Sequence, residues 1–195
     1  MKSKPFLTLL AGVPCSGKST YRNKFIPKDR FAINADDIQM EILTQAGWEY
    51  HERFVLPKGG EVEHPRYGIN VDGEWSKVEE INIAIDEHFG LRVLDAINLI
   101  GDGESVVIDL TCHTKAYRAS VIEWFTRYHE RDSFTLEVVV FEFESIKQRI
   151  FELNEKRSEA GKIIPRERIE EMMAEFEMPT HEEGFEFIEY VRGIA

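Results

Sequence analysis

The 195-residue sequence has few cysteines, fewer basic than acidic residues and no long hydrophobic run. Its two cysteines, Cys15 and Cys112, lie far apart in the chain and neither belongs to a CxxC pair. We therefore expect free thiols in a reducing, cytoplasmic compartment, not a disulfide. The apolar stretch at residues 6–11, FLTLLA, is short and runs directly into a polar loop. Neither a signal peptide nor a membrane span is expected from it.

The charge balance limits the classes of partner. The chain has 24 lysines and arginines against 36 aspartates and glutamates, a formal net charge of −12. Because nonspecific binding to nucleic acid depends on basic residues, this composition argues against a protein that coats DNA or RNA. Basic residues recur within residues 2–30 and 149–168. This distribution is compatible with a positively charged cleft on an otherwise acidic protein. The sequence does not indicate an oligomeric state.

Apolar, β-branched runs alternate with segments of helical periodicity. Strands are predicted at residues 6–11, 31–33, 104–110, 133–143 and 185–191, and helices at 18–25, from about 36, and at 78–100, 114–128, 145–157 and 165–176. This alternation predicts an α/β fold with one parallel sheet between two layers of helices. Residues 1–195 are expected to form a single domain. An insertion without periodicity, at about 46–77, follows the second strand and helix.

Residues 12–19, GVPCSGKS, match the pattern GxxxxGK[ST] between a predicted strand and a predicted helix. In such a P-loop, backbone N–H groups and the helix N-terminus bind phosphate oxygens. We expect the loop to bind ATP through Gly12, Pro14, Cys15, Ser16, Gly17, Lys18, Ser19 and Thr20. Lys18 would contact the outer phosphates and the Ser19 hydroxyl would hold Mg²⁺. The alternative, a turn that binds nothing, is disfavoured by the full motif in this context.

Carboxylates follow two other predicted strands. Asp36 could accept the proton of an acceptor hydroxyl during phosphoryl transfer, or residues 36–39 could form a capping box at the start of a helix. Asp109 could lie near Mg²⁺ or the acceptor, or simply begin a turn. Thr111, His113 and Arg118 follow Asp109 and could bind the acceptor.

The segment NEKRSEAGKIIP, within residues 153–166, joins the basic end of a predicted helix to a link rich in small and polar residues. Such a segment suits a lid over a nucleotide, with Arg157 stabilising charge on the transferred phosphoryl group. A solvated helix face is the alternative.

Taken together, GVPCSGKSTY, INADDI, VVIDLT and NEKRSEAGKIIP resemble the kinase domain of the bacteriophage and eukaryotic polynucleotide 5′-kinases, within a broader group of P-loop kinases. The resemblance implies a three-layer P-loop NTPase fold with a helical lid and Mg²⁺-dependent transfer of the γ-phosphate of ATP to a 5′-hydroxyl of DNA or RNA, as in nucleic acid repair. It also implies that Lys18 and Ser19 contact ATP and Mg²⁺, that Asp36 is the general base, that Asp109 belongs to the acceptor loop and that Arg157 is the lid arginine.

Two positions depart from the family. Gln39 stands where family members carry an arginine that grips the acceptor's phosphate, and Leu153 stands where a second lid arginine falls. The insertion could compensate, because it mixes aromatic and basic residues that suit base stacking and phosphate contact, or its aromatics could form a core of their own: Trp48, Tyr50, His51, Arg53, Lys58, His64, Arg66, Tyr67 and Trp75. Kinases of a small molecule or of a modified DNA base, and an ATP-binding switch without an acceptor, stay open as alternatives.

Overall fold

The computed structural model describes residues 4–27, 30–47, 75–157 and 164–192, and of residues 75–80 it describes the backbone alone. Most of the predicted insertion and the centre of the predicted lid, residues 158–163, therefore lie outside the described part of the chain. In that part no helix is long and apolar enough to span a bilayer.

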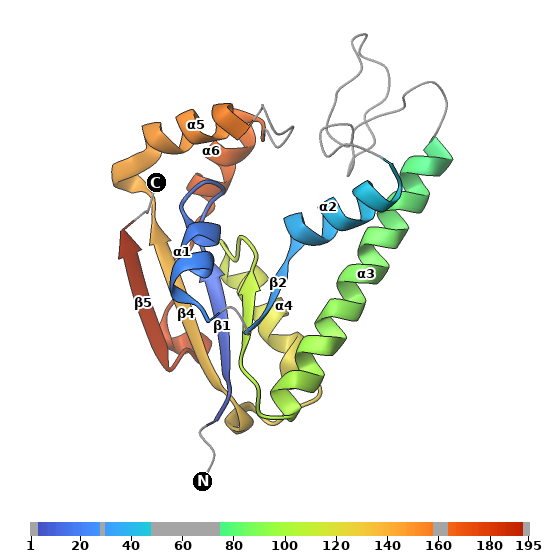
Figure 1. The fold of residues 1–195 in the computed structure, drawn as a ribbon. Coiled ribbons are helices and arrows are strands. Elements are labelled where there is room, and N and C mark those ends of the chain that lie inside the picture. The colour runs from blue at the N-terminus through green and yellow to red at the C-terminus, as the bar shows by residue number, and fades with distance from the viewer. Residues whose placement is uncertain (1–3, 28–29, 48–74, 158–163, 193–195) are drawn as a thin grey trace.

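Five parallel strands form one sheet in the order β2-β3-β1-β4-β5 (Figure 1). The strands are β1 (Phe6–Ala11), β2 (Phe31–Asn34), β3 (Val106–Asp109), β4 (Thr135–Glu142) and β5 (Phe187–Arg192). The helices are α1 (Lys18–Phe25), α2 (Ala35–Gln45), α3 (Trp75–Gly101), α4 (Lys115–Thr126), α5 (Lys147–Lys156) and α6 (Arg166–Ala174). Short 3-10 turns lie at Arg131–Ser133, Glu144–Ile146 and His181–Glu183. The predicted α/β fold with a parallel sheet is confirmed, and the strand and helix bounds shift by a few residues at most.

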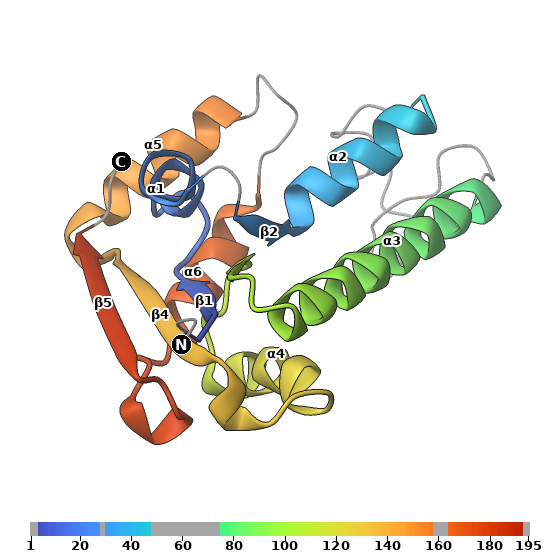
Figure 2. The same cartoon turned by 60° about the horizontal axis from the view of Figure 1, so that its bottom comes forward.

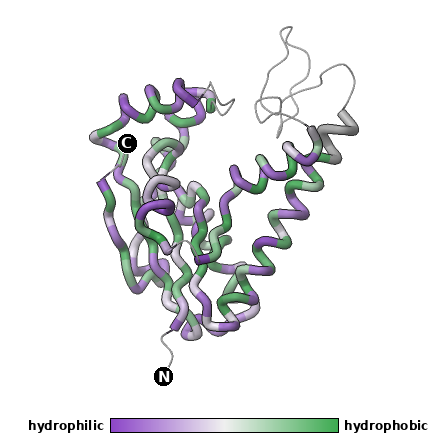
Figure 3. The backbone as a smooth tube through the Cα atoms, viewed as in Figure 1, coloured by the Kyte–Doolittle hydropathy of each residue, from purple (hydrophilic) through white to green (hydrophobic). Residues whose placement is uncertain are grey.

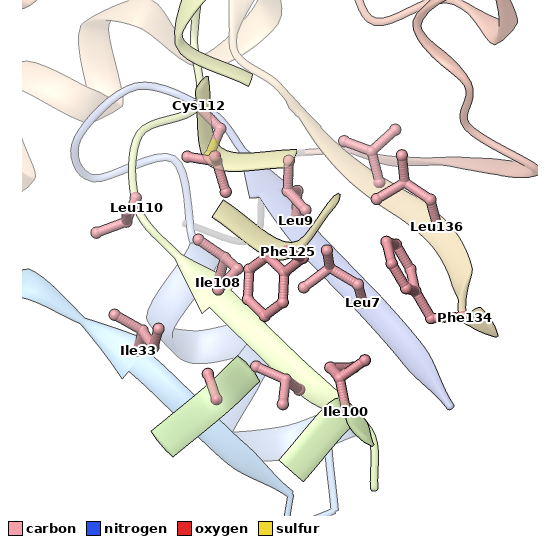
Figure 4. Packing of buried hydrophobic residues seen from close by; sticks show 14 of the residues in the cluster. Leu7, Leu9, Ile33, Ile100, Ile108, Leu110, Cys112, Phe125, Phe134 and Leu136 are labelled. Atoms are coloured by element: carbon pink, nitrogen blue, oxygen red, sulfur yellow. The ribbon is translucent and has the colours of Figure 1, made fainter. Parts of the chain in front are cut away.

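The strands alternate side chains between two helical layers. On β1, Leu7 and Leu9 belong to a core cluster with residues of α3 and α4, whereas Leu10 packs on the opposite face toward Tyr21 of α1. Figure 4 shows Leu7 and Leu9 on the same side of the sheet as Phe125 of α4. Because successive side chains of a strand point to opposite faces, this arrangement makes three layers. Figure 2 shows α1 and the pair α3–α4 on opposite sides of the sheet, and Figure 3 shows hydrophobic residues concentrated along the central strands.

The chain leaves the neighbouring strands β1 and β3 in opposite directions. From β1 it passes through α1 to β2 at one edge, and from β3 it passes through α4 to β4 on the other side of β1. In open α/β sheets, ligands bind at the carboxyl ends of strands where such a switch occurs. The topology therefore places a site at the loops after β1 and β3.

The helices α5 and α6 pack together against the loop after β1. Ile150 and Phe151 of α5, Ile169 of α6 and Val13 of the loop form one buried cluster. The side-chain amide of Asn154 also donates to the carbonyl of Ile164 at 2.7 Å and accepts from its N–H at 3.1 Å. These contacts fix both ends of the predicted lid segment beside the loop.

Candidate functional site

A cleft of about 520 Å³ opens at the carboxyl ends of β1, β2 and β3. It brings together segments that are far apart in the sequence. Its lining consists of Pro14, Cys15, Gly17, Lys18, Ser19, Thr20, Asn34, Ala35, Asp36, Asp109, Leu110, Thr111, Tyr117, Leu153, Arg157, Ile164 and Met172. Most of the residues predicted to bind nucleotide or to act in catalysis thus share one cleft.

The loop between β1 and α1 has the curled backbone that a phosphate-binding loop requires. Cys15 and Gly17 adopt positive φ angles of 61° and 104°, which turn successive peptide groups. A Cβ on Gly12 would lie 2.7 Å from Ser16 Oγ and 2.9 Å from Phe141 Cβ, so only glycine is accommodated there. Gly12 and Ser16, both predicted to bind nucleotide, are not part of the cleft lining. Ser16 is fully buried.

Lys18 is turned back onto its own loop. Its Nζ donates to the carbonyl oxygens of Gly12 at 2.7 Å and Val13 at 2.9 Å. Burial lowers the pKa of this ammonium, and the nearby Asp109 carboxylate opposes that effect. A triphosphate entering the cleft would offer oxygen acceptors of greater charge than these two carbonyls.

Asp36 and Arg157 face each other across the cleft. Arg157 Nη2 lies 3.2 Å from Asp36 Oδ2, and Arg157 Nη1 lies 3.5 Å from Cys15 Sγ. Both partners keep partial access to solvent, with side-chain exposures of 31% and 44%. The structure therefore joins the predicted base on α2, the predicted lid arginine at the end of α5 and the loop after β1.

The alternative role for Asp36, as the cap of α2, is wrong. The cap is Asn34, whose side-chain oxygen accepts from the Asp37 N–H at 2.9 Å. The Asn34 amide also donates to Asp109 Oδ2 at 2.8 Å. Asp36 therefore does not cap α2, and it lines the cleft.

Asp109 lies at the base of the cleft with 2% of its side chain exposed. Burial raises the pKa of this carboxyl group, while Lys18, Arg22 and the bond from Asn34 oppose the rise. Arg22 Nη1 lies 3.1 Å from Asp109 Oδ2, and Arg22 Nη2 lies 3.1 Å from Asp37 Oδ2. Sequence reasoning missed Arg22 and Asn34. The signals were the position of Arg22 one helical turn after Ser19 and that of Asn34 at the end of a strand.

Of the four residues predicted to bind an acceptor, Thr111 lines the cleft, whereas Gln39, His113 and Arg118 do not. The prediction for Arg118 is wrong, because its side chain is fully buried. Its guanidinium pairs with Glu183 at 2.7 Å and also donates to the carbonyls of Cys112 and Glu177. His113 lies 3.6 Å from Glu175, and burial lowers its pKa.

The cleft supplies some, but not all, of the oxygen ligands that a divalent cation such as Mg²⁺ requires. Ser19 offers a hydroxyl and Asp109 a carboxylate, which are oxygen ligands of the kind that Mg²⁺ prefers. Within the described ranges no group of three or more His, Cys, Asp and Glu side chains could hold a metal ion. In many Mg²⁺ sites one or two protein groups act together with substrate phosphates and water.

Comparison with known proteins gives matches among solved structures alone. No family model and no curated protein matches the sequence. A candidate kinase from Chloroflexus aurantiacus superposes with a TM-score of 0.58 at 12% identity, covering 97% of this chain and 89% of the other. Kti12 from Chaetomium thermophilum in complex with ADP-AlF3 gives 0.53 at 14% identity, covering 95% and 88%. The chain therefore shares the α/β fold of these two proteins. The Pnkp1/Rnl/Hen1 RNA repair complex contains a further chain with this fold, at a TM-score of 0.53 and 19% identity, over 90% of this chain and 45% of that one.

Proposed function

We propose that this protein is an ATP-dependent kinase that transfers the γ-phosphate to a hydroxyl group. The observation that carries the proposal is the meeting of Asp36 and Arg157, 3.2 Å apart, over the lysine-containing loop. A nucleotide-binding switch needs the loop alone. A carboxylate within the same cleft supplies a group that can accept a proton from an acceptor.

In the proposed reaction the acceptor hydroxyl gives its proton to the Asp36 carboxylate. The hydroxyl oxygen forms a bond to the γ-phosphorus, and the bond from that phosphorus to the β,γ-bridging oxygen breaks. The electron pair of the broken bond leaves with ADP. Lys18 and Arg157 bind the phosphate oxygens and stabilise the charge on the transferred group. Arg157 contacts Asp36 in this structure. If the guanidinium bound a phosphate instead, the Asp36 carboxylate would become available to accept the proton.

Ser19 and Asp109 are the described residues that would hold Mg²⁺. When bound, the ion would neutralise charge on the β- and γ-phosphates. The residues themselves orient the site: Asp109 is fixed by Asn34 and Arg22, and Ser19 lies at the start of α1.

As acceptor we propose first a 5′-hydroxyl end of DNA or RNA. The sequence motifs that resemble polynucleotide kinases support this choice, and the fold shared with a chain of an RNA repair complex is compatible with it. A small-molecule hydroxyl is the second candidate, and a specific observation favours it. Among the described residues that line the cleft, Lys18 and Arg157 are the cations, and Gln39 lies outside the lining. A nucleic acid backbone would need basic contacts beyond these two.

The test is incubation with γ-labelled ATP and a panel of acceptors: 5′-hydroxyl oligonucleotides, hydroxymethylated DNA, nucleosides and sugars. The proposal expects label on an acceptor and little free phosphate without one. Asp36→Asn should bind ATP normally and lose transfer, whereas the neighbouring Asp37→Asn serves as the matched control and should retain it. Release of free phosphate with no labelled acceptor would instead indicate an ATPase switch, and labelling of small molecules alone would exclude the polynucleotide acceptor.

A further inference from the structure

We propose that Arg22 and Asn34 are positioning residues that hold Asp109 and the first turn of α2, and through them Asp36, in register with the loop after β1. The inference rests on the proposed function for its catalytic consequence. The geometry behind it is a set of two hydrogen bonds and two ion pairs that join α1, β2, β3 and α2.

Asn34 uses both ends of its side-chain amide. Its nitrogen donates to Asp109 Oδ2 at 2.8 Å, and its oxygen accepts from the Asp37 backbone N–H at 2.9 Å. A carboxylate cannot donate and an N–H cannot accept, so the chemistry fixes the orientation of the amide. Asn34 and Asp109 are also paired in register between β2 and β3. The end of β3 thereby sets where α2 begins.

Arg22 supplies the second connection. Its two terminal nitrogens reach two different carboxylates, Asp109 and Asp37, each at 3.1 Å. Arg22 follows Ser19 by three residues on α1, so the two side chains share a helix face. The planar guanidinium can bridge both acids in a fixed geometry, which the single ammonium of a lysine cannot reproduce.

Asp36 lies in the chain between Asn34 and Asp37, the two residues that these contacts hold in place. Asn34 and Asp109 fix the strand end before it, and the Asp37 backbone and side chain are bonded directly after it. The Asp109 contacts are buried, with 2% side-chain exposure, whereas Asp37 is 64% exposed. The buried contacts therefore carry most of the constraint, since exposed ion pairs contribute little. A displacement of about 1 Å at a reacting group can cost on the order of 100-fold in rate.

The test compares Arg22→Ala, Arg22→Lys and Asn34→Asp with Arg127→Ala, at the exposed C-cap of α4, as control, after a thermal melt confirms that each variant folds. Arg22→Ala should lower kcat by about 10- to 100-fold with the Kd for ADP changed by less than about threefold. The kcat of Arg22→Lys should lie between those of wild type and Arg22→Ala. Arg127→Ala loses an exposed ion pair with Glu123 that takes no part in these contacts, and its kcat should stay within about threefold of wild type.

Asn34→Asp removes the donor of the Asn34–Asp109 hydrogen bond and keeps an oxygen that can accept from the Asp37 N–H. Its kcat should fall by about 10- to 100-fold while the Kd for ADP changes by less than about threefold, a difference between kcat and binding that lost stability alone would not produce. An unchanged kcat would overturn the inference.

A measurement without an acceptor separates this inference from the proposed function. Amide hydrogen exchange in the first turn of α2 should be at least about tenfold faster in Arg22→Ala and Asn34→Ala than in wild type, and unchanged in Arg127→Ala. Unchanged exchange in the first two variants would overturn the positioning role, whatever their activity. A wild-type protein that labels no acceptor would overturn the proposed kinase, and the exchange result would still decide whether Arg22 and Asn34 hold the first turn of α2.

Discussion

Replacing Arg118 by methionine should strongly lower the stability of the protein and should leave the KM for an acceptor unchanged. The Arg118 side chain has no exposure and Glu183 has 5%. Two of its nitrogens bond the Glu183 carboxylate at 2.7 and 2.8 Å, and a third donates to the carbonyls of Cys112 and Glu177. Arg118→Met leaves the buried Glu183 carboxylate without its guanidinium partner.

Removing one partner of a buried ion pair costs about 3–5 kcal/mol. For a domain of this size, each kcal/mol lowers Tm by roughly 2–4 °C, so the expected loss is about 6–20 °C. Glu183→Gln keeps an oxygen for the Thr180 N–H, which Glu183 Oε1 accepts at 3.0 Å, and isolates the loss of charge. The double variant Arg118→Met with Glu183→Gln should lose less than the sum of the single losses, because no unpaired charge is left buried.

Urea unfolding and calorimetry measure these differences. The matched control is Arg127→Met at the C-cap of the same helix α4, where the Arg127–Glu123 pair is exposed at 65% and 57%. That variant should change stability by about 0.5 kcal/mol or less. If Arg118→Met kept wild-type stability and raised the KM for an acceptor, the structural role would be refuted and the role predicted from sequence restored.

Three further predictions concern the cleft and its surroundings. Gly12→Ala should cost about 1–3 kcal/mol and weaken nucleotide binding, since its Cβ would lie 2.9 Å from Phe141 Cβ; unaltered unfolding and ADP affinity would contradict this. Iodoacetamide should label Cys15, which lines the cleft, and ATP should slow that labelling; Cys112, buried with a pKa raised to about 12, should stay unlabelled in the mass spectrum. Burial lowers the pKa of His113, so its stabilising contribution is present above its unfolded pKa and is lost as the pH falls through the folded value. Wild type should therefore lose stability relative to His113→Asn between pH 7 and 5, and parallel stability curves would exclude this effect.

Local patterns were sufficient for the sheet and for the loop after β1. The strand at residues 6–11 and the helix at 18–25 have the bounds that the sequence predicts, because an apolar run and a P-loop motif fix them without distant contacts. The pattern at residues 36–39 misled the assignment of the cap. Asn34, two positions earlier, is also a capping residue type, and it is the one that caps α2. Its side chain is held by a hydrogen bond to Asp109, 75 residues away, which no local pattern reveals.

Long-range partners explain the rest. Arg118 follows a strand end, as a binding residue would, but its burial depends on Glu177 and Glu183, 59 and 65 residues further along the chain. Asp36 and Arg157 were each predicted on local grounds, and their contact spans 121 residues. Sequence pattern identified the charged groups of the cleft, whereas which acid pairs with which base is a property of the fold.

The charges of the cleft bear directly on the choice of acceptor. Among its described lining residues, Lys18 and Arg157 are balanced by Asp36 and Asp109. Binding of a triphosphate must therefore depend strongly on backbone N–H groups of the loop and on the N-terminus of α1, which act without net charge. An acceptor that carried its own phosphates would approach Asp36 and Asp109 with no further cation from this described lining to meet it. Phosphorylation of a polynucleotide end would thus require basic residues outside this lining, and the predicted insertion offers Arg53, Lys58 and Arg66. Neutralising those three should abolish transfer to an oligonucleotide and leave transfer to a nucleoside intact.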